Sequence, residues 1–269
     1  KSVHPNYGEF YDLRWFTPGA QINETVIDPT LGQFQLRCDQ LLNIGDCCIG
    51  MEVCEDLWAP APPSTSAALA GANLILNPSA SNELIAKADY RRDLVRMASA
   101  RNLCAYAYAG AGPTESTKDV VFGGHCLIAE NGHILAESDR FALEGASVIA
   151  DIDIHALNHD RRQNRSFSNA ARSNRYRTTT IHASHSSSPL QLDRHIQKHP
   201  FVPSDEHEFA ARAQEILSIQ ATGLARRTQA AGSERLVIGL SGGLDSTLAY
   251  LVCLDTLAKL ARPNTQLCA

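Results

Sequence analysis

The feature that most constrains the fold is a segment rich in glycine and serine near the C-terminal end of the chain. Residues 235–240 (RLVIGL) predict a buried strand, residues 241–246 (SGGLDS) a tight loop, and residues 247–261 a helix. Glycine permits positive φ and lets backbone amides approach an anion closely, while the serine hydroxyls and the helix dipole add further attraction. This order predicts a phosphate-binding loop at the start of a parallel, Rossmann-like nucleotide-binding sheet. The alternative is a turn of small residues that binds no ligand.

Up to about residue 155, short apolar runs alternate with Ala-rich or amphipathic stretches, which predicts an α/β layer architecture. Asn131-Gly132 lies between two apolar runs and predicts a hairpin, because a type I′ turn needs positive φ at both central residues. Antiparallel strands are therefore expected beside parallel ones. The remaining predicted strands are 31–37, 46–53, 73–77, 103–110 and 146–154, and the predicted helices are 65–72 and 86–102.

We predict two domains, at residues 1–161 and 204–269. After Arg161 the composition shifts to Arg, Ser, Asn, Thr and His with little periodicity, so residues 162–203 are predicted to be an arm and linker. Ser204 followed by two acidic residues suits a helix N-terminus, and the helix is expected to continue to about residue 232.

The composition excludes several classes of protein. A formal net charge of -5 provides no global positive field for nucleic acid or for an anionic membrane. No apolar run approaches the roughly 20 residues that a membrane-spanning helix needs. The 8 cysteines include no CxxC pair and are typical of the reduced thiols of a cytoplasmic protein. His182 and His185 are spaced HxxH without a companion ligand, so we expect no metal site there.

Cys54 closes a predicted buried strand and is followed at once by Glu55, Asp56 and Trp58. A thiolate at neutral pH needs a positive neighbour. Taken alone, Cys54 is better interpreted as one of several buried thiols. Lys1, however, opens the string KSVHPNYGEFYDLRWF, which precedes the cysteine segment EVCEDLW.

These two strings resemble the lysine and cysteine segments of the nitrilase superfamily, the carbon–nitrogen hydrolases. The resemblance implies an αββα sandwich with a Glu, Lys, Cys triad, in which Lys1 is the catalytic lysine and Cys54 the nucleophile. Glu9 corresponds to an additional glutamate eight residues after the lysine. The family's general-base glutamate lies upstream of the lysine, so we expect the chain to be a fragment, cut at both ends.

The loop at 241–246 lacks the lysine of a Walker motif and resembles the pyrophosphate loop of N-type ATP pyrophosphatases. A nitrilase module followed by this loop resembles the family of glutamine-dependent NAD(+) synthetases. Such enzymes release ammonia from glutamine and amidate nicotinate adenine dinucleotide, with ATP and Mg²⁺, to give AMP and pyrophosphate. We therefore expect these small molecules as partners, no permanent cofactor, no nucleic acid or membrane, and a homo-oligomer.

The same resemblance implies two sets of binding residues. Lys87 would contact the glutamine carboxylate as a point charge, where Arg in a family member would be a bidentate fork. The residues implied for glutamine are Tyr7, Glu55, Ser81 and Lys87, and those implied for ATP are Gly239, Leu240, Ser241, Gly242, Gly243, Leu244, Asp245 and Ser246.

Two other interpretations stay open. The chain is also compatible with a different glutamine amidotransferase, or with a nitrilase-type amidase that carries a nucleotide domain. It is also compatible with a catalytically silent fragment.

Overall fold

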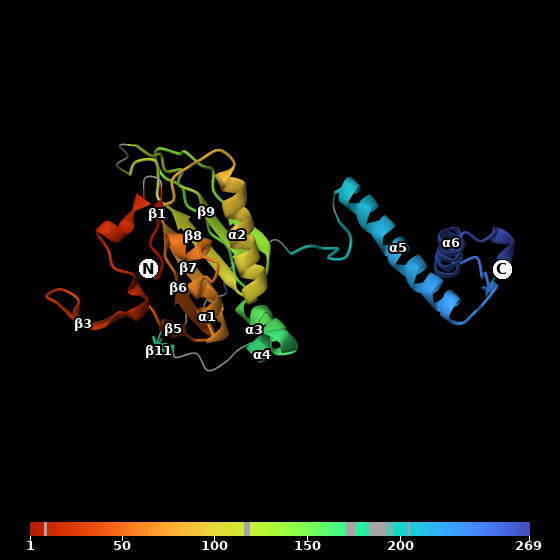
Figure 1. The fold of residues 1–269 in the computed structure, drawn as a ribbon, viewed down its shortest axis with the longest axis horizontal. Coiled ribbons are helices and arrows are strands. Elements are labelled where there is room, and N and C mark those ends of the chain that lie inside the picture. Colours follow the sequence, from red (N-terminus) through yellow and green to blue (C-terminus); the bar gives the residue numbers. More distant parts are fainter. Residues whose placement is uncertain are drawn as a thin grey trace. The chain divides into compact units, whose positions relative to one another are not determined.

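The structure is a computed structural model that describes residues 1–7, 10–115, 119–170, 176–182, 192, 194, 196–203 and 205–269. The chain divides into two compact units, Lys1–Arg194 and His195–Ala269 (Figure 1). In the described residues no helix is long and apolar enough to cross a membrane.

Unit 1 is built on a mixed sheet of seven strands in the order β10-β9-β8-β7-β6-β5-β11. The pairs β6–β7, β7–β8 and β5–β11 are parallel, and the other neighbours are antiparallel. A mixed sheet with parallel strands at its centre agrees with the predicted α/β class. The strands are β5 (Gln40–Ile44), β6 (Cys47–Met51), β7 (Leu74–Ser79), β8 (Ala105–Gly110), β9 (Cys126–Glu130), β10 (His133–Glu137) and β11 (Arg177–Thr180).

Helices α1 (Pro63–Leu69) and α2 (Lys87–Asn102) pack against one face of this sheet (Figure 1). Ala67 of α1 and Val95 and Ala98 of α2 are buried against strand residues such as Ile75 and Tyr106. Small residues on the helices let them approach the sheet closely, so the apolar core of unit 1 lies between these two layers.

The predicted hairpin at Asn131-Gly132 is confirmed as the β9–β10 turn. Asn131 has φ 45° and Gly132 φ 85°, the positive values that a type I′ turn needs. A Cβ atom on Gly132 would also lie 2.9 Å from the Cβ of Ala100 on α2. Glycine is therefore required here both by the backbone and by the close approach of the helix.

The strand predicted at 146–154 is wrong. Residues 145–153 belong to no strand, and α3 (Ile154–Gln163) begins where the strand was expected to end. The N–H of Asp153 donates to Glu130 (2.6 Å), and the Asp153 carboxylate caps the helix by accepting from the N–H of Ala156 (2.8 Å). Side chains thus satisfy the backbone that a strand partner would otherwise satisfy.

Residues 162–203, predicted to be an arm, contribute ordered elements to unit 1. They contain α4 (Arg165–Ala170) and the edge strand β11, which pairs with β5. The sequence of β11 is RTTT, and all four residues are exposed. It carries the β-branched residues of a strand without the apolar alternation that identifies one.

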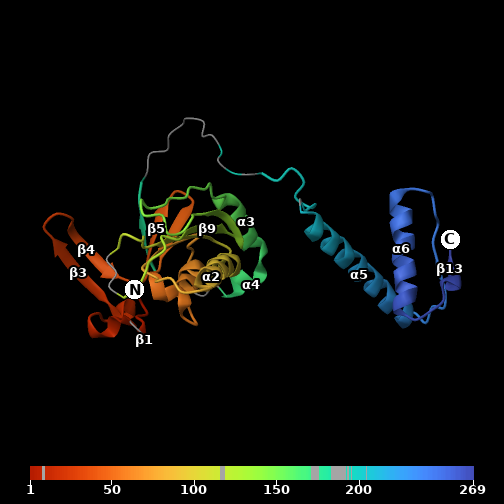
Figure 2. The same cartoon turned by 90° about the horizontal axis from the view of Figure 1, so that it is seen from above.

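A two-stranded ribbon, β3 (Asn23–Asp28) and β4 (Gly32–Arg37), projects from the main sheet (Figure 2). The strand predicted at 31–37 is confirmed as β4, although it pairs in this separate ribbon.

Unit 2 contains α5 (Glu206–Ala230), β12 (Leu236–Val237), α6 (Leu244–Lys259) and β13 (Leu267–Cys268), and β12 and β13 are parallel. The α5 cap is Asp205, whose carboxylate accepts from the N–H of Glu208 (2.7 Å). Ser204, the predicted cap, lies outside the described residues. The helices pack through Ala221 and Leu257, and the Thr256 hydroxyl donates to the carbonyl of Ala221 (3.2 Å).

Arg161 on α3 ties the helical layer of unit 1 together. Its guanidinium is buried and donates to four carbonyl oxygens: Ala72 (2.6 Å), Leu103 (2.8 Å), Asn102 (2.9 Å) and Gly71 (3.3 Å). Asn102 and Leu103 form the C-terminal end of α2, where the helix dipole favours a cation. Arg161 therefore satisfies backbone acceptors that no helix residue can reach.

We expect Arg161→Met to destabilise unit 1 by about 3 kcal/mol, because it removes charge-assisted hydrogen bonds and leaves buried carbonyls unpaired. Urea denaturation followed by circular dichroism measures this free energy of unfolding. The matched control is Arg162→Met, since the neighbouring Arg162 is exposed. Equal stability of the two variants would contradict the role given to Arg161.

Candidate active site

Cys54 lies directly beyond β6, at the start of the 3-10 helix Cys54–Trp58. Its φ of 54° is left-handed, a conformation that costs a residue other than glycine of order 1–3 kcal/mol. The backbone N–H of Cys54 donates to the Oδ1 of Asn77 on β7 (2.9 Å). The strained turn is therefore held from the neighbouring parallel strand.

Asn77 is itself fixed by a buried polar chain beneath the turn. Its Nδ2 donates to the hydroxyl of Tyr106 (2.8 Å), and that hydroxyl donates to Oε1 of Glu52. The other oxygen of Glu52 accepts from the N–H of Ser64 (2.8 Å). Burial raises the pKa of Glu52, and these hydrogen bonds only partly oppose the effect. This series of hydrogen bonds runs from Ser64 on α1 through Tyr106 on β8 to the backbone of Cys54.

Lys1 reaches the site from the N-terminal segment and forms an ion pair with Asp12, at 2.6 Å between Nζ and Oδ2. His4 also approaches this carboxylate (3.4 Å). Burial acts to raise the pKa of Asp12, but the hydrogen bonds and charges of Lys1 and His4 outweigh it and hold the pKa below its usual value. Asp12 therefore carries the negative charge that partners Lys1.

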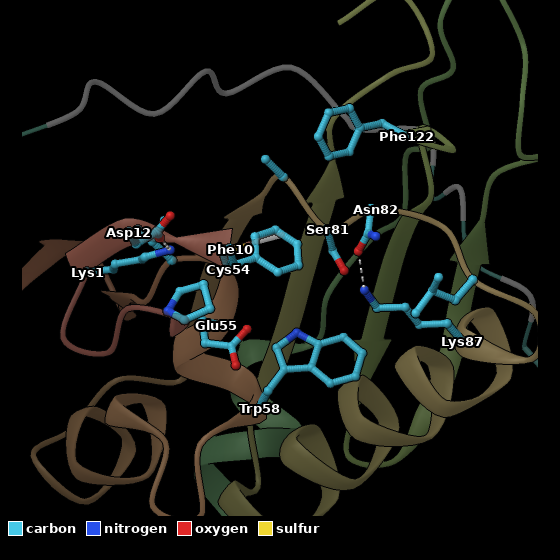
Figure 3. Close-up of a pocket in the computed structure, with 14 residues that line it drawn as sticks. Lys1, Phe10, Asp12, Cys54, Glu55, Trp58, Ser81, Asn82, Lys87 and Phe122 are labelled. Atoms are coloured by element: carbon cyan, nitrogen blue, oxygen red, sulfur yellow. Dashed lines mark hydrogen bonds and ion pairs between the residues drawn. The ribbon is translucent and has the colours of Figure 1, made fainter. Parts of the chain in front are cut away.

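A cavity of about 680 Å³ brings five of the predicted residues together: Lys1, Cys54, Glu55, Ser81 and Lys87. Figure 3 shows Lys1 with Asp12 at one side of this cavity and Lys87 with Asn82 at the other. Trp58 lies between these two sides in the same view. The cavity is thus lined by a thiol and by two separate ammonium groups.

Lys87, the first residue of α2, donates to Oδ1 of Asn82 (2.8 Å), and its ammonium lies 5.4 Å from the centroid of the Trp58 ring. Burial, reinforced by the charge of Arg91 one turn later, lowers the pKa of Lys87. Arg91 is paired with Glu83 at 2.8 Å. A desolvated ammonium of this kind is stabilised by an anion that enters the cavity.

For two predicted residues the structure describes no side chain, so their place at the cavity stays a prediction. Tyr7 lies in β1 (Asn6–Tyr7), opposite Phe10 of β2 (Phe10–Tyr11). Glu9 lies outside the described residues. Asp12, Trp58 and Asn82 also line the cavity, although the sequence did not predict them as site residues. Asp12 and Trp58 stand within the two strings that carried the resemblance, whereas only the fold brings Asn82 next to Lys87.

Burial favours the protonated form of three other thiols of unit 1. Burial raises the pKa of Cys47 and Cys48, and it raises the pKa of Cys104 to about 12. Thiols held in the protonated form are poor nucleophiles. All eight cysteines are free. Among Cys47, Cys48, Cys54 and Cys104, Cys54 is the one that lines the cavity.

In unit 2 the predicted loop lies between β12 and α6, and Gly242 has φ 83°. Gly239 and Leu240 precede the loop, while Leu244, Asp245 and Ser246 form the first turn of α6. The hydroxyls of Ser241 and Ser246 lie 3.1 Å apart, and the N–H of Gly243 donates to the Ser241 hydroxyl (3.4 Å). Amides, hydroxyls and the start of a long helix therefore gather in one exposed loop.

Within the described part of the chain no group of three His, Cys, Asp or Glu side chains is placed to hold a metal ion. His185 of the HxxH pair lies outside that part.

We expect the ammonium of Lys87 to lose its proton at a lower pH in the folded protein than in the chain unfolded by urea. The folded state then gains stability as the pH rises from the folded to the unfolded pKa, because burial penalises the charged form. Isotope-labelled reductive methylation followed by NMR titration measures this, and Lys87→Arg identifies the signal. Titration at the same pH in both states would contradict the burial of this group.

Comparison with known proteins places the chain in a family. The family described as Carbon-nitrogen hydrolase matches residues 5–162. The glutamine-dependent NAD(+) synthetase of Mycobacterium tuberculosis (strain ATCC 25618 / H37Rv) is 37% identical over 281 residues, which cover 100% of this chain and 41% of that protein. The Bos taurus protein of the same name is 30% identical over 286 residues, covering 100% and 39%.

A crystal structure of a glutamine-dependent NAD(+) synthetase from Cytophaga hutchinsonii aligns with a TM-score of 0.48 and 25% identity, covering 97% of this chain and 34% of that one. The chain thus spans about two fifths of the length of the curated relatives. The resemblance recognised from the lysine and cysteine segments is confirmed: the chain belongs to the carbon–nitrogen hydrolase family.

Proposed function

We propose that unit 1 hydrolyses glutamine in the Cys54 cavity, and that the complete protein uses the ammonia to amidate nicotinate adenine dinucleotide at the expense of ATP. The observation that carries the first half is the meeting of Cys54 and two cationic side chains, Lys1 and Lys87, in one cavity. The second half is supported by the loop at 241–246 and by the names of the relatives.

The chemistry at Cys54 follows the nucleophilic pattern of a thiol and a base. A carboxylate base, the glutamate that the family places before the lysine, takes the thiol proton. The Sγ atom attacks the amide carbon of glutamine, and the resulting oxyanion is stabilised by the Lys1 ammonium and the N–H of Glu55. The C–N bond then breaks, and ammonia leaves with the proton returned by the base. Water cleaves the thioester to glutamate and frees the thiol.

The two sides of the cavity suit the two ends of glutamine. The amide end lies at Cys54 and Lys1, and the α-carboxylate pairs with the ammonium of Lys87. Ser81 and Glu55 offer a hydroxyl and a carboxylate for the α-ammonium group, and Tyr7 remains a proposed contact. Binding at the far end holds the amide carbon next to Sγ, which lowers the entropy cost of the attack.

In unit 2 the donor set of the loop fits the leaving pyrophosphate of ATP. Residues 239–246 provide backbone amides and two hydroxyls at the N-terminus of a helix of 16 residues. Mg²⁺ bound with ATP would neutralise phosphate charge, and Asp245 is the carboxylate of this loop suited to hold it.

We expect Cys54→Ala to abolish synthesis with glutamine and to leave synthesis with added ammonia unchanged, because the second reaction does not need the thiol. The assay uses the complete protein, encoded by the full open reading frame that contains this chain. Cys47→Ala is the matched control and should keep both activities. A glutamine-analogue electrophile, mapped by mass spectrometry, should label Cys54. Labelling of Cys47, Cys48 or Cys104 instead would refute the assignment.

We expect Gly243→Val to abolish synthesis with either nitrogen source while Cys54 remains open to labelling. Gly243 has φ −82°, and an added Cβ would lie 3.5 Å from Ser241 Oγ, so the fold tolerates the side chain while the phosphates do not. Gly223→Val on an exposed part of α5 is the control.

The products of the reaction test the loop directly. With ATP labelled at the γ position, AMP and labelled pyrophosphate should appear in equal amounts. Release of ADP and orthophosphate would contradict the pyrophosphatase interpretation. Pyrophosphate release stimulated by a different carboxylate would instead identify another amidotransferase.

A further inference from the structure

The carboxylate of Asp56 joins the two segments that carry Lys1 and Cys54. Its Oδ1 accepts from the backbone N–H groups of Ser2 (2.8 Å) and Val3 (2.7 Å). Its Oδ2 accepts from the N–H of Val53 (2.9 Å). Ser2 directly follows Lys1 and Val53 directly precedes Cys54, so one side chain is bonded to the neighbours of both residues.

Asp56 is buried, with only 1% of the residue exposed, so water cannot replace a hydrogen bond that its carboxylate loses. A buried carboxylate is costly unless hydrogen bonds replace its water, and here three N–H donors do so. Any shift of the lysine segment away from the cysteine turn would leave the charge underpaired. The three bonds therefore resist relative movement of the two segments.

A simple helix cap would not need this geometry. The bond from Val53 to Oδ2 is the local contact that caps the 3-10 helix Cys54–Trp58. The two bonds to Oδ1 come from Ser2 and Val3, which precede Asp56 by 54 and 53 positions in the sequence. The Oδ1 atom of Asp56 thus binds the N-terminal segment, which the helix cap does not require.

We propose that Asp56 is a positioning residue for glutamine hydrolysis, which fixes the backbone of Lys1 relative to the Cys54 turn. Asp12 holds the ammonium end of Lys1 at 2.6 Å, and Asp56 holds the backbone end. A long, flexible lysine side chain is fixed in space only when both ends are held. This inference rests on the proposed glutaminase activity and adds a residue to it.

The test is Asp56→Asn in the complete protein, assayed for glutamine hydrolysis. Asparagine keeps the shape of the side chain but replaces one acceptor oxygen with a donor, so at least one of the three bonds is lost. We expect kcat to fall about 100-fold, the effect of a misplacement of about 1 Å in an active site. KM for glutamine should change little, because Lys87 and Ser81 lie on other elements. Asp93→Asn, at an exposed position of α2, is the control and should retain kcat.

A second variant removes one of the donors to Asp56 and leaves the carboxylate unchanged. Val3→Pro removes the N–H of an exposed loop residue and leaves Asp56 and its bond to Val53 intact. We expect kcat to fall with KM again little changed. Ammonia-dependent synthesis should stay at the parental level in both variants, as an internal measure of folded protein.

The outcomes separate this inference from the function on which it rests. Parental kcat in Asp56→Asn or Val3→Pro would overturn the positioning role. A fall in ammonia-dependent synthesis in parallel with glutamine hydrolysis, or loss of the thermal unfolding transition, would show a purely structural role and overturn it too. If the unmodified complete protein hydrolysed no glutamine, the proposed function itself would fail.

Discussion

The left-handed backbone at Cys54 is the constraint around which unit 1 is organised. A residue with a β-carbon adopts this conformation only where its surroundings fix it. Here the restraint comes from Asn77 on the adjacent strand, and behind Asn77 from Tyr106 and Glu52 in the core. The parallel pairing of β6 with β7 and of β7 with β8 sets these side chains side by side. The backbone strain at Cys54 is thus offset by buried hydrogen bonds to side chains of the neighbouring strands.

Electrostatics divides the cavity into two sides. Lys1 is matched by a carboxylate at 2.6 Å, whereas Lys87 contacts a neutral amide oxygen and the face of Trp58. The pKa of Lys87 is accordingly lowered by burial. In the proposed reaction the paired ammonium of Lys1 would stabilise transient negative charge, and the desolvated ammonium of Lys87 would bind a permanent anion.

Much of unit 1 could be predicted because local patterns decide it. The Asn131-Gly132 turn follows from backbone sterics, and α2 and β8 follow from their periodicity. The predictions failed where tertiary contacts replace the local pattern. Residues 146–154 look like a strand but are held by Glu130 and an Asp153 cap, and β11 looks like linker but completes the edge of the sheet.

The sequence by itself determined the chemistry available to this protein: a cysteine at the end of a strand, a lysine segment, and a glycine- and serine-rich loop before a helix. These are local features, since residue type and immediate neighbours define them. The partners of those residues were decided only by the tertiary structure. Asp12 forms an ion pair with Lys1, Asn82 accepts a hydrogen bond from Lys87, and Asp56 accepts hydrogen bonds from two backbone segments. The reason is physical: a hydrogen bond or ion pair depends on distance in space, and the bonds from Ser2 and Val3 to Asp56 join residues more than fifty positions apart.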